Sequence, residues 1–243
     1  YFFSFFCSDF SILIKVSIPK TSDSNLFHSA AHNIRLTNNC NSTIWPAWRG
    51  IIRTPHGGGT TLESGQSIDF KFPDTWIGGG VFWARTGCDD NFNCETGGCG
   101  NHEQCNGIRS ELGVTIAILV NNTYTVAVFE GFNIQIQVKP HNGTGDCKAI
   151  GECNDDVIAE CPTKLRRVRN GRAVECLGPC TALRKEKYCC FSHYYSPDKC
   201  KPSKYSRFFK ERCPTVVSYM FDDVIDKFTC KDADYEIIGL QFS

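Results

Sequence analysis

The stretch TIAILVNNTYTVAVFEGFNIQIQV, residues 115–138, decides the fold class of this chain. Residues 115–120 and 124–129 are short runs rich in β-branched and aromatic side chains, and residues 134–138 alternate isoleucine or valine with glutamine. Such runs, with a period of two, are typical of neighbouring strands in an antiparallel sheet. Because the apolar face of that sheet must be covered, we expect a second sheet against it and a mainly β, sandwich-like core.

Cysteine is the second dominant feature of the sequence. The chain has 243 residues and sixteen cysteines, a density too high for a reduced cytosolic protein of ordinary composition. The spacings lack the paired C-x₂-C modules that indicate zinc. We therefore expect an oxidised, disulfide-linked protein with no metal and no cofactor. Hydrophobic residues make up 41% of the chain, which is enough to build a core beside the disulfides.

Composition divides the chain into regions. Residues 1–33 are expected to be a partial secretory leader and its junction, because an apolar start runs into a polar stretch; a buried strand is the alternative. No segment approaches the roughly 18 uninterrupted apolar residues of a membrane span. A small disulfide-looped lobe is expected over about 86–111 and a cysteine-rich lobe over about 147–212, with short helices at 173–175 or 181–187. The sandwich core is expected over about 34–85, 112–146 and 213–243.

Charge is balanced overall but unevenly distributed. The 26 basic and 26 acidic residues argue against a strongly basic nucleic-acid binder, so no nucleic-acid partner is expected. Fourteen basic and four acidic residues lie between Cys161 and Arg212. A solvated loop is one interpretation of the densest cluster, and a site for polyanionic glycans or anionic lipid head groups is the other. That cluster consists of Lys164, Arg166, Arg167, Arg169 and Arg172.

Three Asn-x-Ser/Thr sequons begin at Asn41, Asn121 and Asn142. They are predicted glycosylation sites, as expected for a secreted protein. Each could equally be an ordinary turn, since asparagine is favoured there for backbone reasons.

Several words of the sequence resemble the thaumatin-like (pathogenesis-related group 5) family. They are WARTGC at 83–88, EGFN at 130–133, CPTKL at 161–165, YCC at 188–190 and YSRFFK at 205–210. The resemblance covers about residues 34–240, although Gly98 stands where the family usually has Asp. It implies a compact, monomeric β-sandwich with a disulfide-rich helical lobe and a smaller looped lobe, which flank a cleft.

The resemblance also implies a disulfide connectivity that spacing alone leaves open. The family closes its first core cysteine, here Cys40, with one near the C-terminus, but Leu240 stands at that position. We therefore expect Cys40 to be a free thiol; a truncated or mis-spliced chain is the alternative. The seven implied bridges are Cys88–Cys94, Cys99–Cys105, Cys147–Cys230, Cys153–Cys213, Cys161–Cys176, Cys180–Cys189 and Cys190–Cys200.

The family is noted for an acidic cleft of one Arg, one Glu and three Asp, linked with β-1,3-glucan binding and, in some members, weak endoglucanase activity. Carried over to this chain, the three positions that have lost their charge are Val81, Ile118 and Thr125. Glu130 keeps an acid, and the last position falls on Asp222 or Asp223. Hydrolysis of a glycosidic bond normally needs two suitably placed carboxylates. Glu130, Asp222 and Asp223 are thus only weak catalytic candidates, and we expect no enzymatic activity.

The expected function is that of a secreted plant-type defence protein, extracellular (apoplastic) or vacuolar. It would bind β-glucan or another cell-wall glycan, or an anionic microbial surface, and act as an antifungal protein. A weak endo-β-1,3-glucanase is the first alternative. The second is the ectodomain of a receptor-like kinase, because related modules precede such kinases.

Overall fold

Two four-stranded sheets form the core of the fold, which the computed structural model describes over residues 32–72, 79–225 and 227–240. The first sheet has the order β3-β1-β11-β8. In it, β1 and β11 run parallel and the other neighbours run antiparallel. Its strands are β1 (His32–Asn39), β3 (Ser67–Phe72), β8 (Gln135–His141) and β11 (Asp234–Leu240).

The second sheet is antiparallel throughout, with the order β2-β4-β5-β6. Its strands are β2 (Ile44–Gly50), β4 (Gly80–Thr86), β5 (Ile116–Val120) and β6 (Thr123–Ala127). The predicted sandwich is confirmed, and β5, β6 and β8 are the strands that the alternation indicated. One neighbour relation was wrong, because β8 pairs with β11 in the first sheet rather than with β6.

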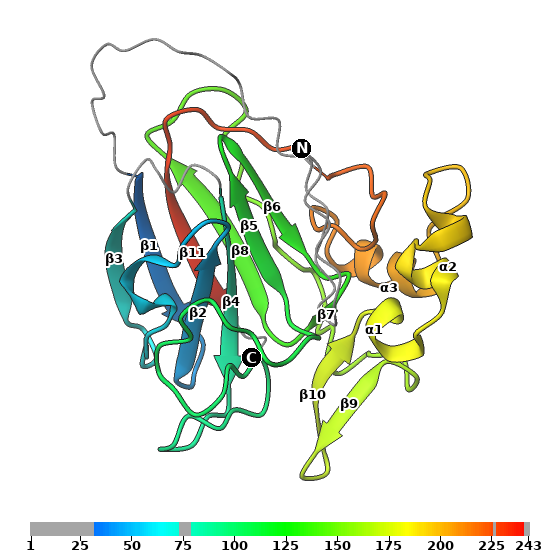
Figure 1. The fold of residues 1–243 in the computed structure, drawn as a ribbon, viewed down its shortest axis with the longest axis horizontal. Coiled ribbons are helices and arrows are strands. Elements are labelled where there is room, and N and C mark those ends of the chain that lie inside the picture. Colours follow the sequence, from blue (N-terminus) through cyan, green and yellow to red (C-terminus); the bar gives the residue numbers. More distant parts are fainter. Residues whose placement is uncertain (1–31, 73–78, 226, 241–243) are drawn as a thin grey trace.

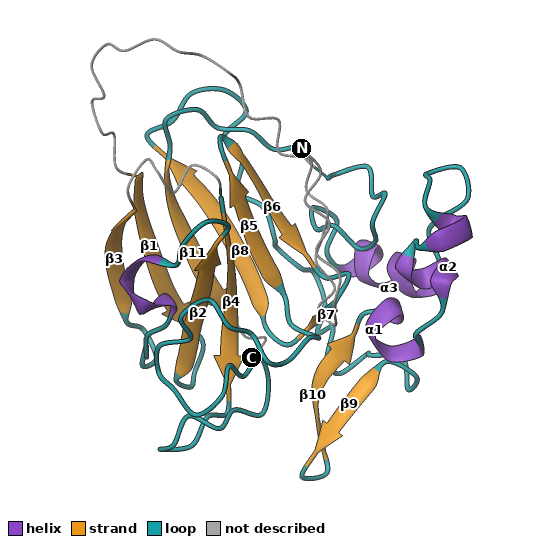
Figure 2. Cartoon of the chain, in the orientation of Figure 1, coloured by secondary structure: helices purple, strands orange, loops and turns teal. Residues whose placement is uncertain are grey.

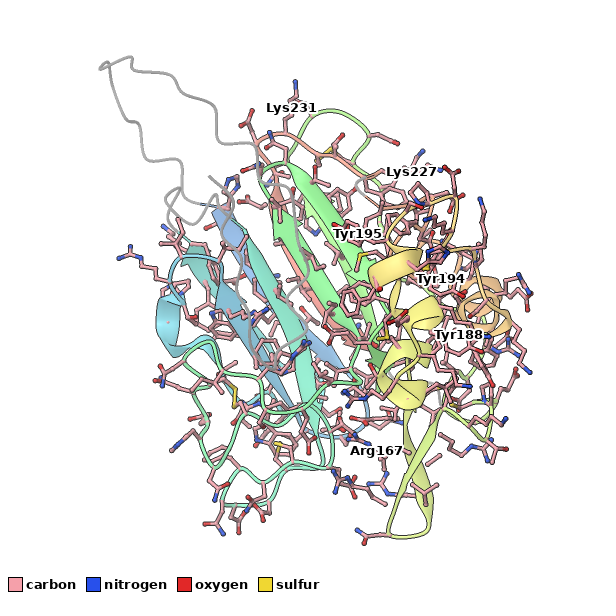
Figure 3. All side chains as sticks on the ribbon, turned by 45° about the vertical axis from the view of Figure 1, so that its right-hand side comes forward. Arg167, Tyr188, Tyr194, Tyr195, Lys227 and Lys231 are labelled. Carbon is pink, nitrogen blue, oxygen red and sulfur yellow. A yellow bond between two sulfur atoms is a disulfide. The ribbon has the colours of Figure 1, made fainter. Side chains whose placement is uncertain are left out.

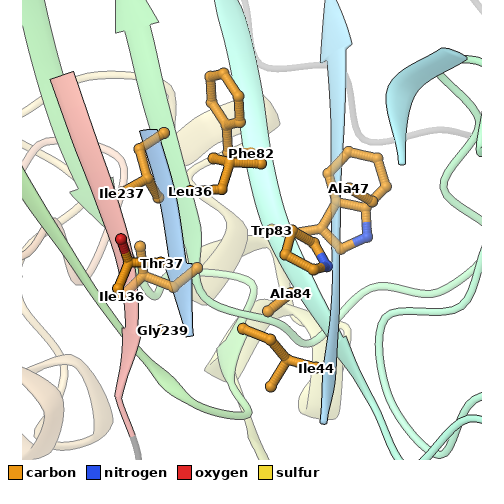
Figure 4. A pocket seen from close by; sticks show the side chains of 11 residues that line it. Leu36, Thr37, Ile44, Ala47, Phe82, Trp83, Ala84, Ile136, Ile237 and Gly239 are labelled. Atoms are coloured by element: carbon orange, nitrogen blue, oxygen red, sulfur yellow. The ribbon is translucent and has the colours of Figure 1, made fainter. Parts of the chain in front are cut away.

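Aromatic and aliphatic side chains from both sheets fill the space between them. The ring of Phe72 on β3 lies 6.3 Å from that of Trp48 and 5.9 Å from that of Phe82, both of the second sheet. Farther along, the rings of Tyr124 on β6 and Tyr235 on β11 lie 5.6 Å apart. Figure 4 shows a pocket between the sheets, and its volume is about 20 Å³. That is roughly the space of one water molecule, so the core is closely packed.

A helical lobe lies beside the sandwich, as Figures 1 and 2 show. It is joined to the core by a third sheet of β7 (Gly131–Phe132), β10 (Arg172–Leu177) and β9 (Arg166–Arg169). Its helices are short and are held mainly by disulfides. They are α1 (Pro179–Leu183), α2 (Glu186–Cys189), the 3₁₀ turn η3 (Ser192–Tyr194) and α3 (Lys204–Arg212).

The expected helices of this lobe are found in part. Residues 181–187 overlap α1 and α2, which Arg184 separates by adopting a left-handed conformation with φ 52°. Residues 173–175 instead lie inside strand β10, so a helix there was wrong. The physical reason is tertiary pairing, because β10 bonds to β9 on one side and to β7 on the other.

The small lobe between β4 and β5 is a set of loops fastened by one arginine. Arg85 is fully buried, and its guanidinium donates hydrogen bonds to the carbonyls of Trp45, His102 and Glu103 at 2.7 to 3.1 Å. Burial lowers the pKa of Arg85 to about 10. A further 3₁₀ turn, η1 (Pro55–Gly58), packs on β2. The carbonyl contacts explain why this lobe keeps its shape without strands of its own.

Seven disulfides are present, each with the pairing that the resemblance implies. Among the described cysteines, Cys40 alone is unpaired, and it is buried. The strand register sets its chain neighbour Asn39 opposite Leu240. Strand β1 begins at His32, two residues before the expected domain start, and the rest of the expected leader lies outside the described residues. No helix in the described ranges is long and apolar enough to cross a membrane.

Candidate functional site

A narrow groove lies where the helical lobe meets the sandwich, and we call it the aromatic groove. It has a volume of about 90 Å³. At its rim, Phe191 and Tyr195 are 41% and 57% exposed. Figure 3 labels Tyr188 and Tyr195 on the helical lobe, and both line the groove. The lining is mostly apolar, and its aromatic and acidic members are Phe129, Glu130, Tyr188, Phe191, Tyr195 and Tyr219.

The two walls of the aromatic groove are fixed to each other by a close backbone contact. The amide of Gly178, at the start of α1, donates to the carbonyl of Glu130 at 2.7 Å. A Cβ atom at Gly178 would lie only 1.9 Å from the carbonyl oxygen of Phe129. The Cys180–Cys189 bridge holds α1 to α2 on the lobe side. The groove is therefore a preformed feature whose width depends on this glycine.

Glu130 faces the aromatic groove as expected, but it has a partner that the sequence did not reveal. Nη2 of Arg109, from the small-lobe loop, lies 2.6 Å from Oε2 of Glu130, and the two side chains are 9% and 7% exposed. The same guanidinium lies over the ring of Trp83, 5.8 Å from its centroid. Arg109 thus supplies an arginine near the cleft, from a position that the family resemblance did not indicate.

Asp222, the second acidic candidate, is committed to a structural network. One of its oxygens lies 2.6 Å from Nζ of Lys210, and the other accepts from the amide and the hydroxyl of Ser218 at 2.9 and 2.8 Å. Although its burial works in the opposite direction, the Lys210 and Ser218 hydrogen bonds hold the pKa of Asp222 below its ordinary value. Asp223 is 86% exposed and lies 3.7 Å from Lys210. Neither aspartate lines the aromatic groove, where Glu130 is the sole described carboxylate.

The three uncharged cleft positions come together as one row on the second sheet. Val81 pairs with Ile118, which pairs with Thr125, so their side chains share one face. Ile118 and Thr125 are buried, at 9% and 7% exposure. The row continues to Arg49, which pairs with Val81 from β2. The row is thus separate from the aromatic groove, because none of its members lines that groove.

Of the two interpretations of the arginine cluster, a solvated loop or an anion site, the structure shows no cluster of free arginines. Arg167 lies 3.0 Å from Glu175 and Arg169 lies 3.2 Å from Glu111, while Arg172 pairs with Glu95. Arg166 donates to the carbonyl of Cys161 at 2.6 Å, and Lys164 is exposed. The arginines are not free because acids from other segments of the chain form ion pairs with three of them.

Lysines elsewhere on the helical lobe carry the accessible positive charge. Five of them, on α2, on α3 and on the turn between them, are exposed and make no ion pair with a described carboxylate. Two lie over tyrosine rings, Lys187 over Tyr188 at 5.1 Å and Lys204 over Tyr205 at 5.2 Å. These five, which we call the lysine surface, are Lys185, Lys187, Lys199, Lys201 and Lys204.

Glu175 is a buried acid that the sequence analysis did not single out. Its side chain is fully buried on β10, and neither carboxylate oxygen has a hydrogen-bond partner in the described chain. Burial, opposed by Arg167 and Arg169 and reinforced by Glu111, raises the pKa of Glu175 to about 7. A charge count gives no sign that Glu175 is buried, so the sequence alone would suggest an acid in an ordinary environment.

The three sequons all lie on the surface. Asn41 follows the end of β1, Asn121 is in the β5–β6 turn and Asn142 follows β8, and all three are exposed. Asn121 and Asn142 have left-handed backbones, with φ 53° and 58°, as expected of asparagine in turns. Glycosylation at these positions stays a prediction.

The fold and its groove define a class: a disulfide-rich β-sandwich with a helical lobe and a groove at their junction. The chain belongs to the Thaumatin family, whose model matches residues 38–240. It is 37% identical over 211 residues to "Pathogenesis-related thaumatin-like protein 3.5" of Cryptomeria japonica, covering 83% of this chain and 87% of the relative.

A second relative agrees with this assignment, and a solved structure shows a shared fold. "Thaumatin-like protein 1" of Arabidopsis thaliana is 37% identical over 236 residues, which cover 88% of this chain and 87% of the relative. Among solved structures, a laminaripentaose-producing β-1,3-glucanase in complex with laminaritetraose aligns with a TM-score of 0.56. That alignment covers 88% of this chain and 99% of the glucanase at 10% identity, so it shows a shared fold.

Proposed function

We propose that this thaumatin-family protein is a secreted, non-catalytic binder of a cell-wall glycan such as β-1,3-glucan, which it engages at the aromatic groove. The observation that carries the proposal is the groove's chemistry, aromatic walls with one ion-paired carboxylate. Secretion is supported by the seven disulfides, because such bridges persist in oxidising compartments. The pathogenesis-related names of its relatives support a role in plant defence.

The state of the acidic groups supports the proposal that the protein is not catalytic. A glycosidase needs one carboxyl group to protonate the leaving oxygen and a second to act as nucleophile or base. In the aromatic groove the single described carboxylate, Glu130, is held by Arg109. Asp222 is held by Lys210 and Ser218 and does not line the groove. Two free carboxylates facing one bond are therefore missing from this part of the described chain.

Binding would use the exposed rings at the rim. The volume of the groove, about 90 Å³, is smaller than the roughly 300–1,000 Å³ of ordinary small-molecule sites. A glycan chain would therefore lie across Phe191 and Tyr195, with the apolar faces of its sugar rings against the aromatic faces. Such contacts contribute about 0.5–1.5 kcal/mol for each aromatic partner beyond the area that they bury. A modest affinity that rises with chain length is the expected consequence.

A tyrosine pair provides the direct test. Tyr195 lines the groove, whereas its chain neighbour Tyr194 does not, and both are labelled in Figure 3. Calorimetric titration with soluble laminarin should show binding that Tyr195→Ala weakens by roughly 2- to 12-fold and Tyr194→Ala leaves unchanged. Equal affinities for wild type and Tyr195→Ala would exclude the groove as the binding site.

The lysine surface adds a second, electrostatic step, adsorption to an anionic microbial surface. Its five exposed lysines attract polyanions at long range, and this attraction is screened within about 8 Å at physiological ionic strength. Adsorption to vesicles containing phosphatidylglycerol should fall steeply between low and physiological salt. The paired variant Lys187→Gln/Lys204→Gln should adsorb less than wild type, and the control Lys139→Gln/Lys231→Gln on the sandwich should not. Adsorption that ignores salt would contradict this step.

A further inference from the structure

We propose that the chain has a second ligand site, a groove for a neutral oligosaccharide at the end of the sandwich, distinct from the aromatic groove. We call it the Gln135 groove. It lies where the β1–β2 turn, β7, β10 and the end of β11 meet, and its volume is about 680 Å³. This falls within the range of ordinary small-molecule sites. It shares no described lining residue with the aromatic groove.

Gln135 presents an unused donor to this groove. The residue, on β8, is 7% exposed, and its side-chain oxygen accepts from the amide of Cys153 at 3.3 Å. Within the described chain, its amide nitrogen Nε2 has no hydrogen-bond partner. A side chain that is nine-tenths buried usually satisfies all its polar atoms inside the protein. The free Nε2 atom is therefore available to a ligand hydroxyl.

Trp45 provides a second unused donor together with an aromatic surface. The indole nitrogens of Trp48 and Trp83 donate to the carbonyls of Pro55 and Gly97, each at 2.9 Å. Trp45 is partly exposed in the Gln135 groove, and its indole N–H has no acceptor among the described residues. Buried or half-buried tryptophan usually finds such an acceptor. A sugar ring stacked on Trp45 would supply one from its hydroxyl groups.

Among the described lining residues of the groove the one cation is ion-paired and Asp156 is a carboxylate without an ion pair, which disfavours an anionic ligand. Arg172 and Glu95 form an ion pair with each other across the lining. Asp156 spends one oxygen on the amides of Ile158 and Ala159, at 2.9 and 3.0 Å. Two free donors, an aromatic face and a described lining without an unpaired cation match a neutral saccharide, whose hydroxyl groups both donate and accept. An anionic ligand would gain little here.

The groove also coincides with the place where this chain departs from the pattern of the thaumatin-like family. Cys40 and Leu240 both line it, and they occupy the two positions that a disulfide would join in that pattern. Without the bridge, the β1–β2 turn and the end of β11 are tied only by strand pairing.

Nuclear magnetic resonance of the full, oxidised and unglycosylated chain tests the proposal, because Asn41 lines the groove and a glycan there would interfere. Laminaripentaose, cellopentaose and xylopentaose are each titrated to about 10 mM, which detects millimolar dissociation constants. At least one pentasaccharide should shift the indole signal of Trp45 and the side-chain amide signals of Gln135. The indole signal of Trp48 should stay in place. Trp45 and Gln135 signals that no probe moves would overturn the proposal.

Two variants separate this site from the aromatic groove. Trp45→Phe keeps the ring but removes the N–H, and Gln135→Glu keeps the oxygen bonded to Cys153 but removes the amide donor. Each folded variant should bind the active pentasaccharide roughly 2- to 12-fold more weakly. Binding is followed through the signals of the groove residues that the variant retains. Tyr195→Ala should leave the Trp45 shift unchanged. Loss of that shift in Tyr195→Ala would show a single site and refute the second groove, whatever the outcome for laminarin binding.

Discussion

Nη2 of Arg109 lies 2.6 Å from Oε2 of Glu130, and both side chains are more than nine-tenths buried. The arginine comes from the small lobe and the glutamate from the wall of the aromatic groove, so the pair joins these two parts of the molecule. It also decides the chemistry of the groove, because it neutralises the one described acid there. Further consequences of the structure can be measured.

The first prediction concerns the stability that depends on this pair. Removing one partner leaves the other charge buried, which costs about 3–5 kcal/mol. Arg109→Met and Glu130→Gln should each lower the free energy of unfolding by about this amount in urea, with the disulfides intact. The double variant should lose less than the sum of the two. As a control, Arg35→Met breaks the exposed ion pair with Asp69 and should change little. Additive losses in the double variant would show that the two residues are not coupled.

The second prediction concerns pH and Glu175. Its pKa is about 7 in the fold against an ordinary value of 4.5. Between these values the folded state holds a proton that the unfolded state has lost, so stability falls as pH rises from 4.5 to 7 and then levels off. The shift corresponds to no more than about 3 kcal/mol. Arg167, Arg169 and Glu111 face this group and are included in that pKa.

Glu175→Gln is neutral at every pH and should remove this fall. Urea midpoints at pH 4, 6 and 8 should show the variant gaining on wild type as pH increases. Glu186→Gln, on the exposed face of α2, is the control and should follow wild type. A constant difference between Glu175→Gln and wild type across the three pH values would refute the assignment.

The third prediction is that the thiol of Cys40 is inert in the folded protein. Burial raises the pKa of Cys40 to about 11, so at pH 8 roughly one thiol in a thousand is ionised. Iodoacetamide should label the Cys40 peptide slowly in the native protein and quickly in guanidinium, as quantified by mass spectrometry. Rapid labelling of that peptide under native conditions would contradict its burial.

The fourth prediction concerns the contact that sets the groove's width. Gly178→Ala would place a methyl group 1.9 Å from the carbonyl oxygen of Phe129, so the lobe must move away from the sandwich. We expect a loss of about 1–3 kcal/mol in the free energy of unfolding together with weaker laminarin binding. Gly98→Ala is a matched control, since its nearest atoms lie at 3.8 Å. Unchanged stability and binding in Gly178→Ala would mean that the lobes are not held at this point.

The strands could be predicted from the sequence better than their assignment to the two sheets. The β-branched and aromatic runs at 115–120 and 124–129 and the alternation at 134–138 overlap β5, β6 and β8, because such side chains favour strands and take opposite faces in turn. This pattern could not assign β8 to the other sheet, since which strands pair depends on connections that periodicity does not encode. For the same reason residues 173–175 were expected to be helical, although pairing with β9 places them in a sheet.

The site could be predicted only at positions that the family resemblance identifies by their residue type. Glu130 and the uncharged row of Val81, Ile118 and Thr125 were identified from the resemblance, and the strand register brings that row together. Arg109 was missed because it lies in a loop 21 positions away along the chain, and no motif marks its partner. The two interpretations of the arginine cluster stayed open because a charge count does not show that Glu95, Glu111 and Glu175 pair with it. Long-range ion pairs require the fold.

The most direct test of glycan binding without hydrolysis measures both on one preparation. Wild type and Glu130→Gln are incubated with laminarin, and the release of reducing ends is followed while the affinity is determined by titration. Wild type should bind laminarin and release no reducing ends above a protein-free control, and Glu130→Gln should show no difference in release. Reducing ends that accumulate with wild type and disappear with Glu130→Gln would contradict the account and establish a glucanase.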